Sequence, residues 1–538
     1  MRNQIEYMRY VQYIWFTDHD IRMGRKQYAV DGFDFENSDL LVKEAEGRSH
    51  GFHITEHGGS VLLSKENAFQ GTQCLQMNVA SEGAAWQSAE VTFWSSGKRH
   101  SASLLAGVVL GIALRAKCTD WVNARVMVDI RLSQRPPEHM PAHVIYVAGN
   151  REGMDSRPHT LVIPLDGIEM WKQLKCNLSR VVLTEEAAGC SIGGLDNAFD
   201  TIMIRVESRY GASVTAWADD FSIRVEKTAR ETFEMQKAVA KEKGKIYGVT
   251  PFIGMEISEA GPHKNCFSGK VPLIPYEELN YEVSHEQGCE WVKKHGGIFA
   301  YNHPFERFKK MNISTLDMEE ETDKMAEEFI QHASWGASLL EVGFPEGRYF
   351  PLKYHLKLWD TLGTHGLFLT GYGSSDNHSN QSGWYEGNNF ATWLGVDTQK
   401  ERPQEIDFIR AMKCGNAYTG NPKLISGDVI LETEQGATFG QVVRTRSGSS
   451  IAVRFYCDQA KAGWRQKWIV NGDTMKENVI SSDAFEDYYC VKASQPLGLV
   501  RVEVYDENGK CILLTNPIYI NCVDLSEIKI PIERMVKD

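Results

Sequence analysis

The change in sequence pattern near residue 229 is the feature that most constrains how this chain can fold. Between residues 229 and 422, helix-like segments alternate with short apolar strands, whereas both flanking regions consist of short strands separated by Gly, Asn and Pro clusters. Alternating helices and strands are typical of a parallel sheet or a βα barrel. Evenly spaced short strands are typical of an all-β sandwich. A chain of 538 residues is therefore expected to contain several domains.

The first residues belong with the alternating region in this interpretation. Spaced apolar positions at Ile5, Met8 and Val11 predict the end of a helix, and the apolar run 13–16 predicts a strand that leads into the polar residues 17–20. The predicted domains are an N-terminal barrel piece at 1–31, an inserted β-sandwich at 32–227, the main barrel piece at 228–422 and a C-terminal all-β domain at 423–538.

Composition narrows the class of partner. The net charge of −13 disfavours a nucleic-acid or anionic-membrane surface, which needs clustered Lys and Arg, so a small-molecule substrate is expected. The apolar run at 104–114 is too short to cross a bilayer. Eleven scattered cysteines without a CxxC pair indicate neither a zinc ribbon nor a disulfide framework. The N-terminus lacks the apolar core of a secretion signal, so a cytoplasmic location is expected.

Residues that can bind a metal follow several predicted strands. Imidazole and carboxylate groups that converge from separate strand ends are what a hydrolytic metal site requires. Taken one at a time, His303 could be a buried histidine bonded to a carbonyl group, and Glu256 could cap a helix. As an ordered set they favour a metal site. The residues are His19, Glu256, His263, His303, Glu341, Asp376 and His378.

The motifs resemble those of the PHP (polymerase and histidinol phosphatase) metallohydrolases. Within that family the chain is most similar to the carbaryl-hydrolase type of esterase and amidohydrolase, which carries an insertion like a carbohydrate-binding module. The resemblance implies an α/β fold: a distorted seven-stranded βα barrel interrupted by a β-sandwich, with a small C-terminal all-β domain. It is carried by TDHD at 17–20, GMEIS at 254–258, His263, YNHP at 301–304, LEV at 340–342 and SSDNHS at 374–379.

The resemblance also implies chemistry. It implies two or three divalent ions, commonly Zn, Mn or Fe, that activate water to hydrolyse an ester, carbamate, amide or phosphoester of a small molecule. Glu256 would be the bridging carboxylate, and Asp376 and His378 would be catalytic, with Asp376 or a water that it orients accepting the proton. The implied ligands are His19, Glu256, His263, His303, Asp376 and His378.

The HxH motif that ends the first strand in this family is missing from the sequence. Either the true start lies upstream of Met1, or the chain is a variant with reduced metal content. The first is expected, because Met1 falls inside a predicted helix. Without an HxH motif, the position formed by Glu256, His263 and His303 is the one with its implied ligands complete.

Two further expectations concern ligands and assembly. Arg307 and Arg348 follow metal-bearing strands closely and could hold an anionic group of the substrate. The alternative function is a glycan- or ligand-binding protein with a catalytically impaired barrel. In that case the inserted sandwich could stack sugars on aromatic side chains, although such residues are usually core. In hydrolases of the type that the chain resembles, the insertion could instead shape the substrate pocket or form a dimer interface, so a homodimer is a possible assembly. The aromatic candidates are Trp86, Trp94, Trp121 and Trp217.

Overall fold

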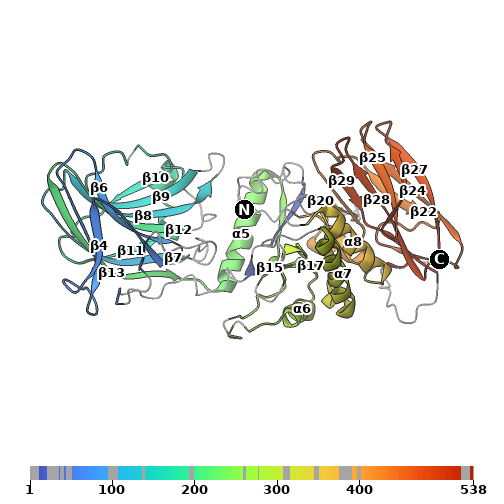
Figure 1. Ribbon diagram of the computed structural model, residues 1–538, viewed down its shortest axis with the longest axis horizontal. Helices are drawn as coiled ribbons and strands as arrows, with labels where there is room; N and C mark the ends of the chain where they lie inside the picture. The colour runs from blue at the N-terminus through green and yellow to red at the C-terminus, as the bar shows by residue number, and fades with distance from the viewer. Residues whose placement is uncertain are drawn as a thin grey trace. The chain divides into compact units, whose positions relative to one another are not determined.

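A computed structural model shows two compact units, one of Arg22–Val239 and the other combining Gln4–Ile21 with Ala240–Asp538 (Figure 1). The predicted domain boundaries stay predictions. The structure describes residues 11–17, 19–20, 35–36, 41–43, 51–94, 104, 107–135, 140–154, 156–192, 199–258, 262–276, 278–280, 282–306, 315–343, 350–374, 390–396, 402–522 and 534–536.

The first unit contains two sheets that face each other (Figure 1). The larger sheet has the order β10-β9-β8-β12-β6-β3-β2, and the smaller has the order β11-β7-β13-β5-β4. Alternate residues of β8, such as Val126, Val128 and Ile130, are fully buried between the sheets. The predicted β-sandwich is confirmed.

The elements of the first unit are mostly strands, with two short helices, of which α3 lies beside β7 and β11. They are β2 (Leu41–Lys43), β3 (Gly51–His57), β4 (Gly59–Ser64), β5 (Cys74–Ser81), β6 (Gln87–Trp94), β7 (Val108–Cys118), β8 (Ala124–Arg135), β9 (Met140–Gly149), β10 (Thr160–Pro164), β11 (Lys172–Asn177), α3 (Leu178–Val181), α4 (Glu185–Gly189), β12 (Phe199–Ser208) and β13 (Ala212–Val225).

The second unit carries the metal-binding motifs on short strands in two sheets. In a two-stranded sheet, β1 (Tyr13–Phe16) pairs in parallel with β14 (Thr250–Ile253). A five-stranded sheet has the order β15-β16-β17-β18-β19, in which β16 runs antiparallel to both neighbours and the remaining pairs are parallel. Its strands are β15 (Met255–Ile257), β16 (Lys264–Cys266), β17 (Phe299–Tyr301), β18 (Leu339–Glu341) and β19 (Thr370–Tyr372).

The predicted fold class, a distorted seven-stranded PHP-type βα barrel, is therefore wrong. The described residues are mostly β, with 43% in strands and 20% in helices, and they form six sheets without an α/β barrel. Residues 255–266 illustrate the error, because they contain two antiparallel strands, β15 and β16, where the apolar pattern predicts one strand that ends at Ile257. A short apolar segment that ends in an acid looks the same in both arrangements.

Four helices, α6 to α9, belong to the second unit, whereas α5 begins in the first unit and ends in the second. The start of α6 is fixed by a capping box between Ser284 and Gln287, later than residue 276, where the apolar pattern predicts it. No helix in the described part of the chain combines the length and the apolar character needed to cross a membrane. The helices are α5 (Ala229–Tyr247), α6 (His285–Lys294), α7 (Thr315–Gln331), α8 (Leu352–Thr364) and α9 (Glu405–Cys414).

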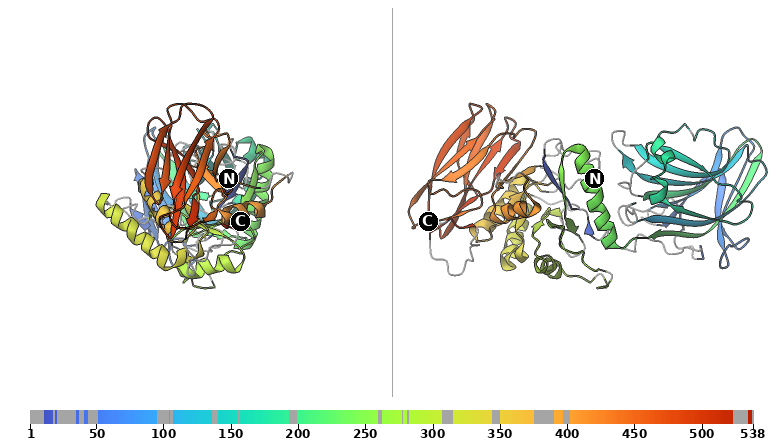
Figure 2. Two further views of the ribbon diagram at one scale, coloured as in Figure 1. Left: turned by 90° about the vertical axis from the view of Figure 1, so that its right-hand side faces the viewer. Right: turned by 180° about the vertical axis from the view of Figure 1, so that it is seen from behind.

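The C-terminal strands form an eight-stranded and a three-stranded sheet around an apolar core that includes Trp468 and Phe455 (Figure 2, orange to red). The larger contains β20 (Ala391–Leu394), β21 (Ala417–Gly420), β23 (Val442–Arg444), β25 (Arg465–Val470), β26 (Asp473–Val479), β28 (Leu497–Tyr505), β29 (Cys511–Thr515) and β30 (Ile518–Asn521). The smaller contains β22 (Val429–Thr433), β24 (Ser450–Cys457) and β27 (Phe485–Lys492).

Two buried polar contacts join this C-terminal region to β19 and to α8. Asn516 binds the backbone of Gly371 through both atoms of its amide, at 2.7 and 3.0 Å. Arg501 on β28 makes two hydrogen bonds of 2.7 Å with Asp360 on α8 and a third of 2.6 Å with Glu503. All three charged side chains are at most 6% exposed. The Arg501 guanidinium therefore compensates two carboxylates that have left water.

Replacing Arg501 with Met is expected to lower the free energy of unfolding by about 3–5 kcal/mol, because two carboxylates then stay buried without their cation. Thermal and urea unfolding of the full chain measure this loss. The control is Arg454→Met. Arg454 also pairs with two carboxylates, but its side chain is 32% exposed, so a loss of about 1 kcal/mol or less is expected. Equal losses in the two variants would contradict the role given to Arg501.

Candidate metal centre

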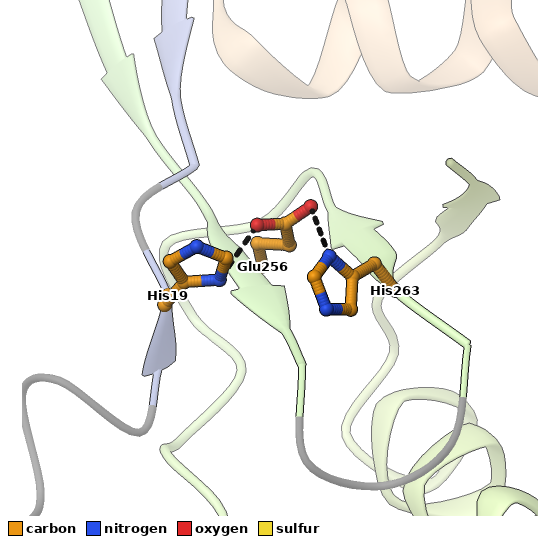
Figure 3. Close-up of side chains that lie close together, drawn as sticks. All are labelled: His19, Glu256 and His263. Atoms are coloured by element: carbon orange, nitrogen blue, oxygen red, sulfur yellow. Dashed lines mark ion pairs between the residues drawn. The ribbon is translucent and has the colours of Figure 1, made fainter. Parts of the chain in front are cut away.

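The parallel register of β1 and β14 brings His19 beside Glu256. Phe16 lies opposite Ile253, and the same register continues past both strands to an isolated bridge between His19 and Glu256. Gly254 permits this path, since a Cβ atom there would lie 2.0 Å from the carbonyl oxygen of Cys266. The side chains of these two residues are also in contact, with His19 Nδ1 2.7 Å from Glu256 Oε2 (Figure 3).

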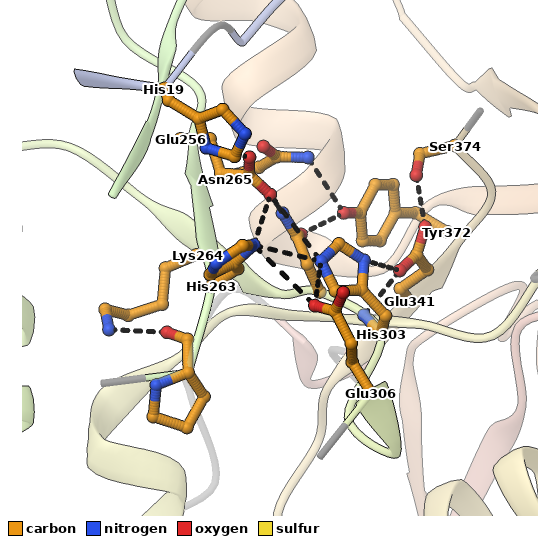
Figure 4. Close-up of polar contacts among 12 residues, drawn as sticks. His19, Glu256, His263, Lys264, Asn265, His303, Glu306, Glu341, Tyr372 and Ser374 are labelled. Atoms are coloured by element: carbon orange, nitrogen blue, oxygen red, sulfur yellow. Dashed lines mark hydrogen bonds and ion pairs between the residues drawn. The ribbon is translucent and has the colours of Figure 1, made fainter. Parts of the chain in front are cut away.

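Two neighbouring strands of the five-stranded sheet supply two more imidazoles. His263 directly precedes β16, and its carbonyl oxygen accepts the N–H of Asn302, which extends the pairing of β16 with β17. His303 then follows two residues after the end of β17. Pairing of β15, β16 and β17 thus gathers Glu256, His263 and His303 at one end of the sheet (Figure 4).

The facing atoms of these side chains lie within the range of ligands to one ion. His263 Nδ1 is 3.4 Å from Glu256 Oε1 and 3.2 Å from His303 Nε2. Glu306 joins the group, with Oε2 3.4 Å from His303 Nε2. Two overlapping sets of possible ligands result, which share His263: His19 with Glu256 and His263, and His263 with His303 and Glu306.

Neighbouring side chains hold the ligands in place. His303 donates its backbone N–H to Glu341 Oε2 at 2.5 Å, and its ring Nδ1 lies 3.2 Å from the same oxygen. The hydroxyl of Ser374 binds the other oxygen of Glu341. With the Nδ1 proton held by a carboxylate, Nε2 of His303 is left to face the ligand group. Figure 4 shows this chain from Ser374 through Glu341 to His303.

A second chain of hydrogen bonds reaches Glu256 from β19. The hydroxyl of Tyr372 accepts from Asn265 at 3.2 Å and donates to Asn302 at 2.6 Å. Asn302 in turn donates to Glu256 Oε1 at 2.9 Å. Burial raises the pKa of Tyr372 well above its usual range, so this hydroxyl keeps its proton and stays a donor.

The two buried carboxylates are ionised at neutral pH. Burial alone would raise the pKa of Glu256, but hydrogen bonds from His19 and His263 outweigh it and hold the pKa well below its usual range. Glu341 is fully buried too, and its hydrogen bond and charge interaction with His303 lower its pKa against the effect of burial. The group is therefore rich in negative charge and imidazole nitrogen, which are the ligands of divalent transition metals.

The backbone at His303 is strained. Its φ angle of +28° lies in the left-handed region, which residues other than Gly rarely adopt. The peptide N–H bonded to Glu341 and the following turn at Pro304 hold this conformation. Strain of this kind persists where the surrounding contacts over-determine it, as they do at functional sites.

The structure thus brings together four of the predicted site residues: His19, Glu256, His263 and His303. The other predicted site residues lie outside the described residues: Asp376, His378, Arg307 and Arg348. Glu306 was missed by sequence reasoning. Its spacing of three residues from His303 was the available signal, because a turn places such residues on one side.

No family model and no curated protein matches the sequence. Solved structures resemble parts of the chain weakly. One of them is a carbohydrate-binding module from the β-sandwich superfamily, at 14% identity and a TM-score of 0.22, covering 35% of this chain and 61% of the module. A second is the family 30 carbohydrate-binding module of a Clostridium thermocellum cellulosomal cellulase, at 13% identity and a TM-score of 0.20, covering 40% and 96%.

A third similar structure is a family 12 xyloglucanase from Bacillus licheniformis, at 9% identity and a TM-score of 0.23, covering 36% of this chain and 97% of the enzyme. These neighbours are sandwich proteins, and none of the findings points to the PHP family. The predicted membership of that family is therefore wrong, and so are the predicted classes of amidohydrolase and phosphoesterase that depended on it. The motifs misled because short strand-end motifs rich in His and acids can occur in unrelated folds.

Replacing Glu341 with Gln is expected to weaken binding of Zn²⁺ by about 10–100-fold, because a neutral amide orients and polarises the His303 ring less than a carboxylate does. Titration calorimetry of the metal-free protein with Zn²⁺ measures the change. The control is Glu432→Gln, an exposed carboxylate on β22 that pairs with Arg454. If both variants bind Zn²⁺ with equal affinity, Glu341 does not position His303.

Proposed function

We propose that the second unit binds a divalent metal ion and uses it to hydrolyse a small-molecule ester. The observation that carries the proposal is the convergence of Glu256 Oε1, His263 Nδ1 and His303 Nε2 to within 3.2–3.7 Å of one another. These atoms come from three neighbouring segments of the chain, so their approach is a property of the fold. The proposal rests on this geometry and not on family membership.

The donor set fits such an ion. Zinc binds imidazole nitrogen and carboxylate oxygen, and catalytic zinc sites commonly have three protein ligands of this kind. Two of the three ligands also have partners behind them: Glu341 lies behind His303, and Asn302 and His19 lie behind Glu256. Such partners fix the orientation of metal ligands and raise their basicity.

A bound ion would act as a Lewis acid that acidifies water and polarises the bond to be cleaved. The chain's own residues would do the rest. Glu341 holds the Nδ1 proton of His303, and Tyr372 fixes Asn302, which fixes Glu256. Asp376 and His378 stay the predicted residues for proton transfer.

Purified protein is expected to contain about one equivalent of divalent metal or more, and to hydrolyse p-nitrophenyl esters in a reaction that chelator abolishes and Zn²⁺ or Mn²⁺ restores. His263→Ala should lower kcat/KM by at least about 100-fold, the size of effect seen when an electrostatic stabiliser of the transition state is removed. Elemental analysis and steady-state kinetics measure both.

The matched control is His295→Ala. His295 ends α6 and lies 2.8 Å from the carbonyl oxygen of Trp291, so it belongs to neither ligand set. Its variant should keep both metal and activity. Metal-free protein that does not take up Zn²⁺ or Mn²⁺ would contradict the metal centre, and metal-loaded protein without esterase activity would contradict the hydrolase.

The outward face of the seven-stranded sheet favours a second candidate, carbohydrate binding by the first unit. On this face Arg125 of β8 lies opposite Glu207 of β12, and Arg205 lies opposite Glu90 of β6. Arg205 Nη2 is 2.7 Å from Glu207, which also binds Arg125. Arg125 and Glu207 are buried, whereas the side chains of Arg205 and Glu90 are 32% and 20% exposed. These two can donate to and accept from sugar hydroxyls in orientations that the network fixes, at little ordering cost.

The aromatic residues predicted to stack on sugars have varied surroundings. The guanidinium groups of Arg125 and Arg209 each lie 4.4 Å from the ring centre of Trp86. Trp217 is buried, Trp121 packs against the core, and the side chain of Trp94 lies outside the described residues. The polar network, and not an exposed aromatic platform, therefore carries this candidate.

If the face binds carbohydrate, Arg205→Ala should weaken the affinity for a soluble β-glucan by roughly 10–100-fold, since hydrogen bonds to a charged group contribute about 1.5–3 kcal/mol. Titration calorimetry measures the affinity, and circular dichroism checks that the variant folds. The control is Arg180→Ala, at an exposed position on α3. Absence of binding to a panel of soluble polysaccharides would dispose of this candidate.

A further inference from the structure

A tight turn after β17 places Glu306 on the same side as His303. The N–H of Glu306 donates to the carbonyl oxygen of His303 at 2.8 Å. Between them Phe305 is fully buried and stacks on Phe350, with ring centres 4.5 Å apart and planes within 4°. A backbone hydrogen bond and the packed ring of Phe305 therefore fix the backbone at Glu306, so only its side chain can adjust.

Five separations among four atoms near His263 are close to those between the ligands of a tetrahedral ion. The separations of His263 Nδ1 are 3.4 Å to Glu256, 3.2 Å to His303 and 3.9 Å to Glu306. Those of His303 Nε2 are 3.7 Å to Glu256 and 3.4 Å to Glu306. A tetrahedral ion with bonds of about 2.0–2.1 Å separates its ligand atoms by about 3.3–3.4 Å. One zinc-sized ion can therefore contact Glu256, His263 and His303, and the carboxylate of Glu306 reaches the same ion if its side chain moves toward it.

His19 does not belong to this tetrahedron. Its Nδ1 atom is 2.7 Å from Glu256 Oε2, which is the length of a charge-assisted hydrogen bond and too short for two ligands of one tetrahedral ion. It binds the carboxylate oxygen that points away from His303. His19 therefore supports Glu256 from behind, in the way that Glu341 supports His303.

Exposure divides the four side chains into two pairs. Those of Glu256 and His303 are 7% and 4% exposed, whereas those of His263 and Glu306 are 29% and 35% exposed. Glu306 is thus the most accessible of the four. Glu306 also lies in the turn that follows β17, whereas Glu256 lies within β15.

We infer that Glu306 is a fourth protein ligand that closes a single tetrahedral metal site, and that it is the ligand displaced when water or an anionic substrate group binds. The inference rests on the metal centre of the proposed function and adds the number of ions, the fourth ligand and the way in which the site opens. A site with four protein ligands is closed, and a catalytic site needs an open position. The partly exposed carboxylate of Glu306 can close the site when it is bound and leave an open position when it is displaced.

Cobalt(II) is a probe for this site, because its visible absorption is intense in tetrahedral coordination and weak at higher coordination numbers. The metal-free full-length chain is titrated with Co²⁺, and stoichiometry and spectrum are recorded for wild type and for Glu306→Ala. We expect one equivalent and an intense tetrahedral spectrum for wild type. In the variant, water should replace the carboxylate, so the absorption bands should shift. The affinity for Co²⁺ should fall at least about 10-fold, because even the loss of a group that supports a ligand lowers metal affinity by this factor.

Acetate added at millimolar concentration should restore part of the wild-type spectrum in Glu306→Ala, because it replaces the missing carboxylate. Glu327→Ala on the exposed side of α7 is the matched control and should leave spectrum and affinity unchanged. A tetrahedral spectrum that is the same in Glu306→Ala and wild type would overturn the inference and leave the metal centre standing. A wild type that binds no Co²⁺ would overturn both.

Discussion

The ionised carboxylate of Glu256 is the interaction on which the candidate site depends. It lies on β15, the first strand of the five-stranded sheet, and its side chain is 7% exposed, so its charge has to be compensated inside the protein. His19, His263 and Asn302 all direct nitrogen atoms at it, and each comes from a different segment of the chain. Strand pairing places these side chains around Glu256. The hydrogen bonds that they form, and the proposed metal, all stabilise its buried negative charge.

The same physics appears where the C-terminal strands meet α8. There Arg501, a residue of the chain itself, supplies the positive charge that Asp360 and Glu503 require, and the contact is closed. At Glu256 the compensating groups are imidazoles, which carry a full charge only when protonated. This difference explains why the Arg501 cluster is a fixed connection, whereas the cluster around Glu256 has the character of a site for a cation.

The comparison of sequence with structure separates local from long-range information. The residue types at the strand ends led to the selection of His19, Glu256, His263 and His303, because imidazole and carboxylate are metal-ligand types, and the structure brings these residues together. The β-sandwich was predicted from short alternating strands. Strand direction was not predictable, since the antiparallel run of β16 depends on pairing with β15 and β17 and not on its own sequence. The predicted barrel rested on the alternation of helices and strands, and the predicted family rested on the motifs at the strand ends.

By itself, the sequence determined which side chains are available and which segments form strands, through residue chemistry and apolar periodicity. The tertiary structure decided how those side chains are combined. It placed His19 behind Glu256 by continuing the register of β1 and β14, and it brought Glu306 to His303 through a turn anchored by Phe305. The physical reason is that distances between ligand atoms are set by pairing and packing between segments far apart in the chain, and no local pattern encodes them.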